Sequence, residues 1–248
     1  MPDHTPALLR RRCLALCLLP LLPTAARPSA ATKPLQAWRD AITRQDSAAL
    51  TALAASGVDV NGLDDRRETP LYHAALADFA AGVTLLLAAG ARHDSRNIRG
   101  DTALHHAGPL TLPLLVAAGA DTLARNGRGR LPLHTARQPA PLLLAGGIDP
   151  RDQFGMTPLH VAAFAGNEEM VAWLLAQRAD PTLRTTAVFD LSAQPGWTDW
   201  DVRHRFEPGQ RPLDLVRWQH EQTKWSSGRY RRALELLDAA TPTRWPWR

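Results

Sequence analysis

Histidine spacing is the first feature of this chain that could indicate chemistry, because imidazole binds metals and transfers protons near neutral pH. His220 and Glu221 open the zinc-binding pattern His-Glu-x-x-His, but lysine stands at position 224, where the second histidine belongs. His105 and His106 are adjacent, so on a helix their side chains would point in different directions and could not share one ion. The histidines therefore predict no metal site.

The other catalytic patterns are also incomplete. Asn126–Arg130 has the spacing Gly-x-Gly, but no strand-to-helix phosphate turn is expected around it. No serine stands in the Gly-x-Ser-x-Gly elbow of hydrolases. The adjacent carboxylates Asp64 and Asp65 are expected to be solvated in a loop. These patterns predict that the protein is not an enzyme and uses no cofactor.

Two groups of side chains are better suited to binding. Arg125, Arg128 and Arg130 occur in a stretch without acidic residues, and guanidinium groups grip carboxylates through paired hydrogen bonds. Six of the eight tryptophans follow residue 196, and Trp197 and Trp200 could form a contact surface, since aromatic side chains dominate interface energies. Two other interpretations stay open, namely a solvated basic loop and tryptophans that pack the C-terminal end.

The N-terminus has the layout of a secretory signal peptide. Arg10–Arg12 precede an apolar stretch, Cys13–Leu22, that is shorter than the roughly 20 residues of a membrane span. We expect cleavage after Ala26 or near Ala30, a linker at 27–33, and a periplasmic or secreted mature chain that is not inserted in a membrane. A short membrane anchor or a buried helix is the alternative.

Export changes what the composition implies. The 248 residues include 29 basic and 24 acidic side chains, and a basic chain can bind nucleic acid. Removal of residues 1–26 takes away three arginines and Asp3, so the net charge falls from +5 to +3. Both cysteines, Cys13 and Cys17, are also removed. The mature chain is therefore not expected to bind nucleic acid or to hold a disulfide or a thiolate metal site.

A recurring phrase organises the chain that would carry these groups. Thr-Pro-Leu-His or a variant of it occurs at 69–72, 102–105, 131–134, 157–160 and, most weakly, 211–214. A second marker, built on Gly-x-Asp, occurs at 57–59, 90–92, 119–121, 147–149 and 178–180. The first interval is 33 residues in both series. A phrase that recurs indicates architecture rather than a catalytic site.

This pattern resembles the ankyrin repeat, which has a period of about 33 residues and the phrase T-P-L-H-x-A. The resemblance implies an all-α solenoid of about six helix-turn-helix units with finger loops between them, over residues 34–240, before a C-terminal tail at 241–248. It also implies structural roles for the repeated threonines and histidines, whose imidazole rings would bond nearby threonine and backbone groups. These residues are Thr69, Thr102, His105, His134, Thr157 and His160.

Local signals place the helices. Thr157 and Asp46 can cap the helices that follow them, and Pro158 fits a first helical position. Leu159 is expected in the core. The helices of the first unit are expected at Leu35–Arg44 and Ser47–Ala55, and those of the last unit at Arg211–Gln222 and Gly228–Ala240.

Three units depart from the repeat. The interval from the first marker to the second is 21 residues in a full unit but 17 and 16 in the two central ones, which also contain several prolines. Shortened second helices and thinner packing are therefore expected there. The last interval is longer, which predicts an insertion at about 184–206 in a finger position, with Trp197 and Trp200 inside it.

The resulting hypothesis is an exported ankyrin-repeat scaffold that binds another protein, with a periplasmic partner, through its concave face and finger loops. Such binding could inhibit or protect an envelope enzyme or a toxin. The alternative is binding of an anionic envelope polymer or a glycan, which arginines and exposed tryptophans could also serve.

Overall fold

A computed structural model describes residues 34–190, 205–222 and 230–241. The expected signal peptide, linker and C-terminal tail lie outside these ranges, as do Trp197 and Trp200.

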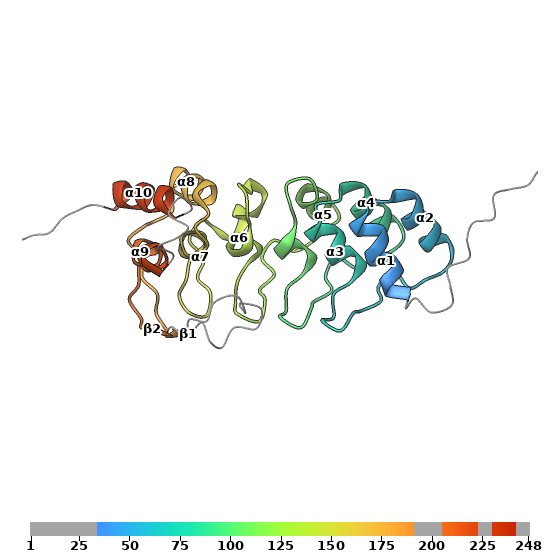
Figure 1. Ribbon diagram of the computed structural model, residues 1–248, viewed down its shortest axis with the longest axis horizontal. Helices are drawn as coiled ribbons and strands as arrows, with labels where there is room; N and C mark the ends of the chain where they lie inside the picture. Colours follow the sequence, from blue (N-terminus) through green and yellow to red (C-terminus); the bar gives the residue numbers. More distant parts are fainter. Residues whose placement is uncertain (1–33, 191–204, 223–229, 242–248) are drawn as a thin grey trace, which may run out of the picture. The chain divides into compact units, whose positions relative to one another are not determined.

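Helices follow one another in antiparallel pairs. The pairs are α1 (Pro34–Thr43) with α2 (Ser47–Ala55), α3 (Pro70–Leu76) with α4 (Ala80–Ala88), η1 (Ala103–His106) with α5 (Leu112–Ala117), α6 (Pro132–Thr135) with η2 (Pro141–Gly146), α7 (Pro158–Ala165) with α8 (Glu168–Ala176), and α9 (Pro212–Gln222) with α10 (Arg231–Ala240). The first helices form one row and the second helices another, and the loops between pairs project on the side of the first row (Figure 1). The predicted helical solenoid with finger loops is confirmed.

The repeated phrase joins each helix to the next finger. The Nδ1 atom of His160 accepts the Thr157 backbone N–H at 3.1 Å, and its Nε2 lies 3.1 Å from the carbonyl oxygen of Gln210. Because a carbonyl can only accept, Nε2 carries the proton. His105 and His134 make the same two contacts, with the carbonyl groups of Arg130 and Met156. These imidazoles therefore hold neighbouring units together.

Acid should weaken these links. Burial lowers the pKa of His134 and His160 to about 4, whereas an unfolded histidine has a pKa of about 6.5. As pH falls from about 6.5 to about 4, these two histidines bind protons in the unfolded chain but stay neutral in the folded chain. We expect the free energy of unfolding to fall by about 1.4 kcal/mol per pH unit for each such histidine.

Urea denaturation at a series of pH values measures this dependence. His160→Gln should be less stable than the wild type at pH 7 but should lose less stability on acidification. An equal slope for both proteins would contradict the assignment of the acid sensitivity to His160.

The two central units contain less helix than the sequence predicts. Their second helices, α5 and η2, are the expected stubs, but their first helices are short as well. Each first helix is followed by an alanine with non-helical backbone angles, Ala107 or Ala136. A proline stands two residues after Ala107 and three residues after Ala136. Because the residue before a proline avoids the α region, the chain cannot continue either helix up to the turn.

The core divides near these short units. One cluster of buried apolar side chains runs from Trp38 to Leu143, and a second runs from Leu159 to Leu237. Ala136 and Trp173, which are both partly buried, pack against both clusters. The boundary between the two clusters therefore falls between η2 and α7.

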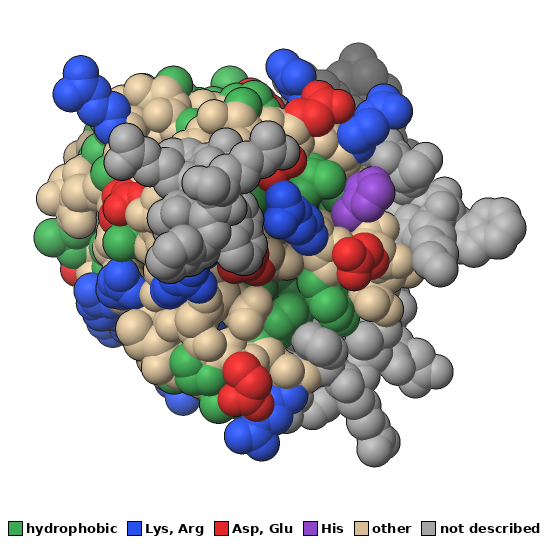
Figure 2. All heavy atoms as spheres, turned by 90° about the vertical axis from the view of Figure 1, so that its left-hand side faces the viewer, with side chains coloured by type: hydrophobic (Ala, Val, Ile, Leu, Met, Phe, Trp, Pro, Cys, Tyr) green, Lys and Arg blue, Asp and Glu red, His purple; other side chains and the backbone are tan. Residues whose placement is uncertain are grey.

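The end that carries α9 and α10 shows basic and acidic side chains interspersed (Figure 2). Arg217 and Asp238 join the two helices with a contact of 2.6 Å, and Arg232 pairs with Glu235 at 3.0 Å. Exposed pairs of this kind contribute little stability, but they leave this end with little excess of either charge.

The last finger keeps its turn despite the insertion. The N–H groups of Thr185 and Gly209 donate to the carbonyl oxygens of Gln210 and Thr185, which is the pattern of the shorter fingers. The extra residues therefore enter between Thr185 and Gly209, slightly later than the 184–206 expected from spacing. A short antiparallel pair that was not predicted, β1 (Phe189–Asp190) with β2 (Arg205–Phe206), spans this finger.

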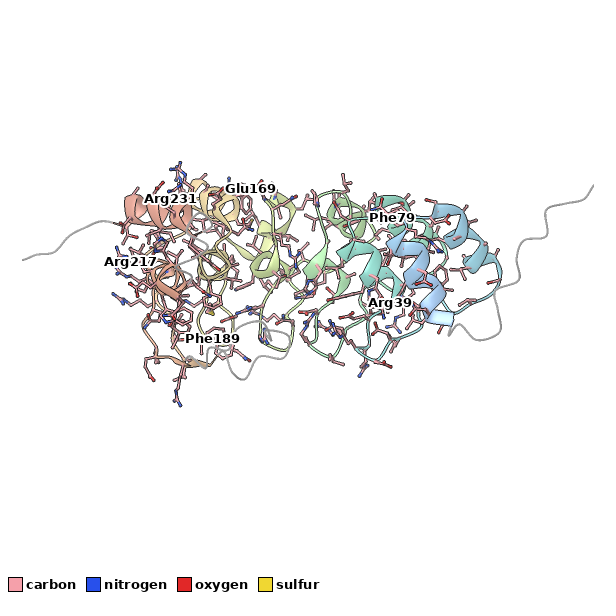
Figure 3. The ribbon with its side chains drawn as sticks, in the orientation of Figure 1. Arg39, Phe79, Glu169, Phe189, Arg217 and Arg231 are labelled. Carbon is pink, nitrogen blue, oxygen red and sulfur yellow. The ribbon has the colours of Figure 1, made fainter. Side chains whose placement is uncertain are left out.

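Aromatic side chains fix this pair to the stack. Phe189, labelled in Figure 3, and Phe206 pack with Phe164 of α7. Trp218 of α9 contacts Phe206 edge-on, with ring centroids 4.9 Å apart. The inserted segment thus leaves and rejoins the solenoid through a packed apolar base.

Candidate protein-binding surface

Each finger turns around one side-chain oxygen. The Oδ1 atoms of Asp64, Asn97, Asn126 and Asp152 accept backbone N–H groups from the residues two and four positions later. Such turns are typical of asparagine and aspartate. Neighbouring fingers are also joined by backbone bonds, for example from the Gly127 N–H to the Arg99 carbonyl at 2.9 Å. The fingers therefore form a continuous hydrogen-bonded edge.

An arginine in each of four fingers reinforces this edge. Every guanidinium donates to the carbonyl oxygen of its own finger's glycine, and three of them also donate to the carbonyl of the matching arginine in the next finger. These residues are Arg96, Arg125, Arg151 and Arg184. Arg125 is exposed, but its guanidinium is already bonded to the carbonyl oxygens of Gly129 and Arg151.

Arg130 departs from the predicted basic tip. Its residue is 8 % exposed, and its Nε lies 2.9 Å from Oδ2 of Asp152. Arg130 is therefore not a solvated tip residue, because Asp152 from the next finger faces it; its contact with a partner stays a prediction.

Arg128 is a half-buried finger cation to which no described side chain is bonded. Its side chain is half-buried and has no hydrogen bond or ion pair with any residue that the structure describes. Burial and the nearby charge of Arg130 lower the pKa of Arg128, although a guanidinium stays charged at neutral pH. A half-buried charge without a partner favours an incoming anion.

Arg99 contacts polar side chains from its own finger and from the preceding unit. Its Nε lies 3.1 Å from Oδ2 of Asp101, and its Nη2 donates to the Tyr72 hydroxyl at 3.3 Å. Burial raises the pKa of Asp101, but bonds from His106 and Asn126 outweigh this effect and hold the pKa well below its usual value. Burial and the Glu68 charge raise the pKa of Tyr72 to about 12. Asp101 is therefore a fixed anion, and Tyr72 remains a neutral hydroxyl.

A pocket of about 230 Å³ lies where the two central units are short. Leu76, Leu104, Leu112 and Leu143 supply apolar surface, and Asp78, His106 and Arg137 supply polar groups. The early ends of η1 and α6 leave this space, which a longer helix pair would fill.

A family model for the ankyrin repeat matches residues 154–186, the stretch of 33 residues that runs from the finger before α7 to the finger after α8. The chain is an ankyrin-repeat protein. A search of curated proteins found no match to it. Ankyrin repeats mediate protein–protein binding, and proteins of this family are generally scaffolds rather than enzymes. Among the described residues, no helix of this ankyrin-repeat protein is both long enough and apolar enough to span a bilayer.

Sequence reasoning missed one group of side chains in this ankyrin-repeat protein. Asp64, expected to be solvated, is half-buried, and its Oδ2 lies 3.1 Å from Nε2 of His73. Oε2 of Glu68 lies 3.9 Å from the same nitrogen. Burial raises the pKa of Asp64, but hydrogen bonds from the backbone N–H groups of Glu68 and Arg66 and from His73 together have the larger effect. The pKa of Asp64 is therefore lower than its usual value. The spacing Asp-x3-Glu-x4-His, which crosses a finger turn into a helix, is the signal that could have identified the group.

Proposed function

We propose that this ankyrin-repeat protein is an exported scaffold that binds one protein partner through its first-helix row and finger loops. The observation that carries the proposal is the half-buried guanidinium of Arg128, to which no described side chain is bonded. It belongs to the finger between the two short units, whose helices also line the pocket beside Leu104 and Leu143. A partner segment with a carboxylate for Arg128 and an apolar side chain for the pocket fits both features.

The proposal of export rests on the N-terminal sequence. Arg10–Arg12 followed by Cys13–Leu22 has the layout of a cleaved secretory signal. In the periplasm, the scaffold would act by covering part of its partner. Inhibition or protection of an envelope enzyme or a toxin is the outcome that we propose for this binding.

Affinity purification of the mature protein from an envelope extract tests the proposal. We expect one protein to be recovered at near-equal stoichiometry. Arg128→Ala should reduce the affinity by about ten-fold or more, the effect of losing an interface arginine. Replacing Trp197 and Trp200 together with alanine should also reduce recovery. Both variants should keep the wild-type melting temperature.

Arg178→Ala is the matched control, because Arg178 is exposed and lies after α8, on a turn away from the finger that carries Arg128. Full recovery by Arg128→Ala would show that this guanidinium does not contact the partner. Loss of thermal stability in the tryptophan variant would instead indicate that those side chains pack the fold.

Binding of an anionic polymer or a glycan predicts a different result. Affinity that depends on several arginines falls steeply as salt increases, whereas an interface with a large apolar part does not. The engagement of Arg125 by backbone carbonyls and of Arg130 by Asp152 favours the protein partner. A steep loss of binding between low and high salt would support the polymer instead.

A further inference from the structure

The carboxylates of Asp64 and Glu68 converge on the imidazole of His73. The Nε2 atom of His73 lies 3.1 Å from Oδ2 of Asp64 and 3.9 Å from Oε2 of Glu68, and the three donor atoms lie within 4.8 Å of one another. Donors bound to one tetrahedral zinc ion lie about 3.4 Å apart, given bonds of about 2.0–2.2 Å. Small side-chain rotations would therefore bring all three atoms onto one ion.

Glu68 provides a second observation that points to a cation. Its side chain is only 7 % exposed, yet among the described residues its Oε2 has no hydrogen bond and faces the His73 ring. Its other oxygen accepts only a long bond of 3.4 Å from Asn97, and the Arg99 guanidinium approaches no closer than 4.0 Å. A buried carboxylate is costly unless a charge or a full set of donors compensates it.

The local charge is also unbalanced. Asp64, Glu68 and Asp101 bring three carboxylates to this region, and Arg99, the cation that reaches both Glu68 and Asp101, is bonded to the latter at 3.1 Å. Among the described residues, three carboxylates of this region thus share one guanidinium within ion-pair distance. A cation bound at Asp64 and Glu68 would reduce this imbalance.

We propose that Asp64, Glu68 and His73 form a binding site for a divalent transition-metal ion, with Zn²⁺ as the best fit. One imidazole nitrogen with two carboxylate oxygens suits zinc, whereas calcium and magnesium prefer oxygen donors alone. On binding, the proton that His73 Nε2 shares with Asp64 must move to Nδ1 or leave. Because Asp64 and His73 keep some exposure, the fourth position on the ion would be open to water or to a donor from another molecule. This site does not depend on the proposed protein partner.

The next unit provides a control. At the same register 33 residues later, Asn97, Asp101 and His106 replace Asp64, Glu68 and His73. His106 pairs with Asp101 at 3.3 Å, but Asn97 contributes no charge, and Asp101 is already bonded to Arg99 and Asn126. This second group should therefore not hold the ion.

Titration of ZnCl₂ into the full chain after treatment with EDTA tests the proposal, with Co²⁺ as a second probe. The wild type should bind one Zn²⁺ at this site, melt at a higher temperature with zinc, and give the visible absorption of tetrahedral Co²⁺. Asp64→Asn and His73→Gln should each weaken zinc binding by at least about ten-fold, because removing a ligand costs no less than removing its supporting partner. His106→Gln should bind like the wild type.

Asp64→Asn separates loss of a ligand from loss of the fold, because asparagine already makes the same finger turn at Asn97 and Asn126. This variant should therefore fold. Absence of zinc binding in the wild type would overturn the proposal. So would unchanged binding in folded Asp64→Asn, or an equal loss in His106→Gln.

Discussion

Leu159→Ala is expected to lower the free energy of unfolding by about 2–5 kcal/mol, the range for a fully buried leucine. Leu159 has no exposed surface and lies in α7, which packs on both α8 and α9. Removing its side chain leaves a cavity in the second apolar cluster, which also contains Leu174 and Leu213. In a repeat stack, stability comes from contacts between neighbours, so one cavity weakens both interfaces of α7.

Urea denaturation followed by circular dichroism measures this effect. Leu142→Ala is the matched control, because Leu142 lies in η2 and is 49 % exposed. Its replacement should change stability by less than about 0.5 kcal/mol. An unchanged denaturation midpoint for Leu159→Ala would contradict the placement of Leu159 in the core.

The solenoid could be predicted because its signals are local. The Thr-Pro-Leu-His phrase marks the start of a helix, since the cap, the proline and the imidazole act within four residues. The interval between the two markers likewise predicted shortened second helices. The early ends of η1 and α6 were missed because interval length shows how many residues are absent but not which helix loses them.

The binding surface was harder to predict because its contacts cross between units. Arg125 bonds the carbonyl of Arg151, and Arg130 pairs with Asp152 from the next finger, 22 residues away. Arg125, Arg128 and Arg130 look equivalent in the sequence, although of these three only Arg128 is left without a partner among the described residues. A count of charges along one loop cannot show which charges the neighbouring loop neutralises.

Arg130→Ala is expected to lower the free energy of unfolding by about 3–5 kcal/mol, the usual cost of leaving one member of a buried ion pair. The side chains of Arg130 and Asp152 are 9 % and 0 % exposed, so water cannot replace the lost guanidinium. Asp152 keeps two backbone bonds to Oδ1, from Phe154 and Met156, but its Oδ2 loses its cation.

The pH dependence of the same variant separates charge from packing. Burial and the positive charge of Arg130 lower the pKa of His134, while Asp152 raises it. Without Arg130, the pKa of His134 should rise toward its ordinary value, and the protonated imidazole would then partly compensate Asp152. The stability lost in Arg130→Ala should therefore be smaller at pH 5 than at pH 7, measured by urea denaturation at both values.

A second replacement, Asp152→Asn, distinguishes the two causes further. Asparagine makes this turn in two other fingers, so Arg130→Ala combined with Asp152→Asn should recover part of the lost stability by removing the uncompensated charge. If the double variant were no more stable than Arg130→Ala, the loss would come from the apolar stem of the arginine. In that case the ion pair would position the fingers without stabilising them, and the buried carboxylate would be tolerated through its backbone bonds alone.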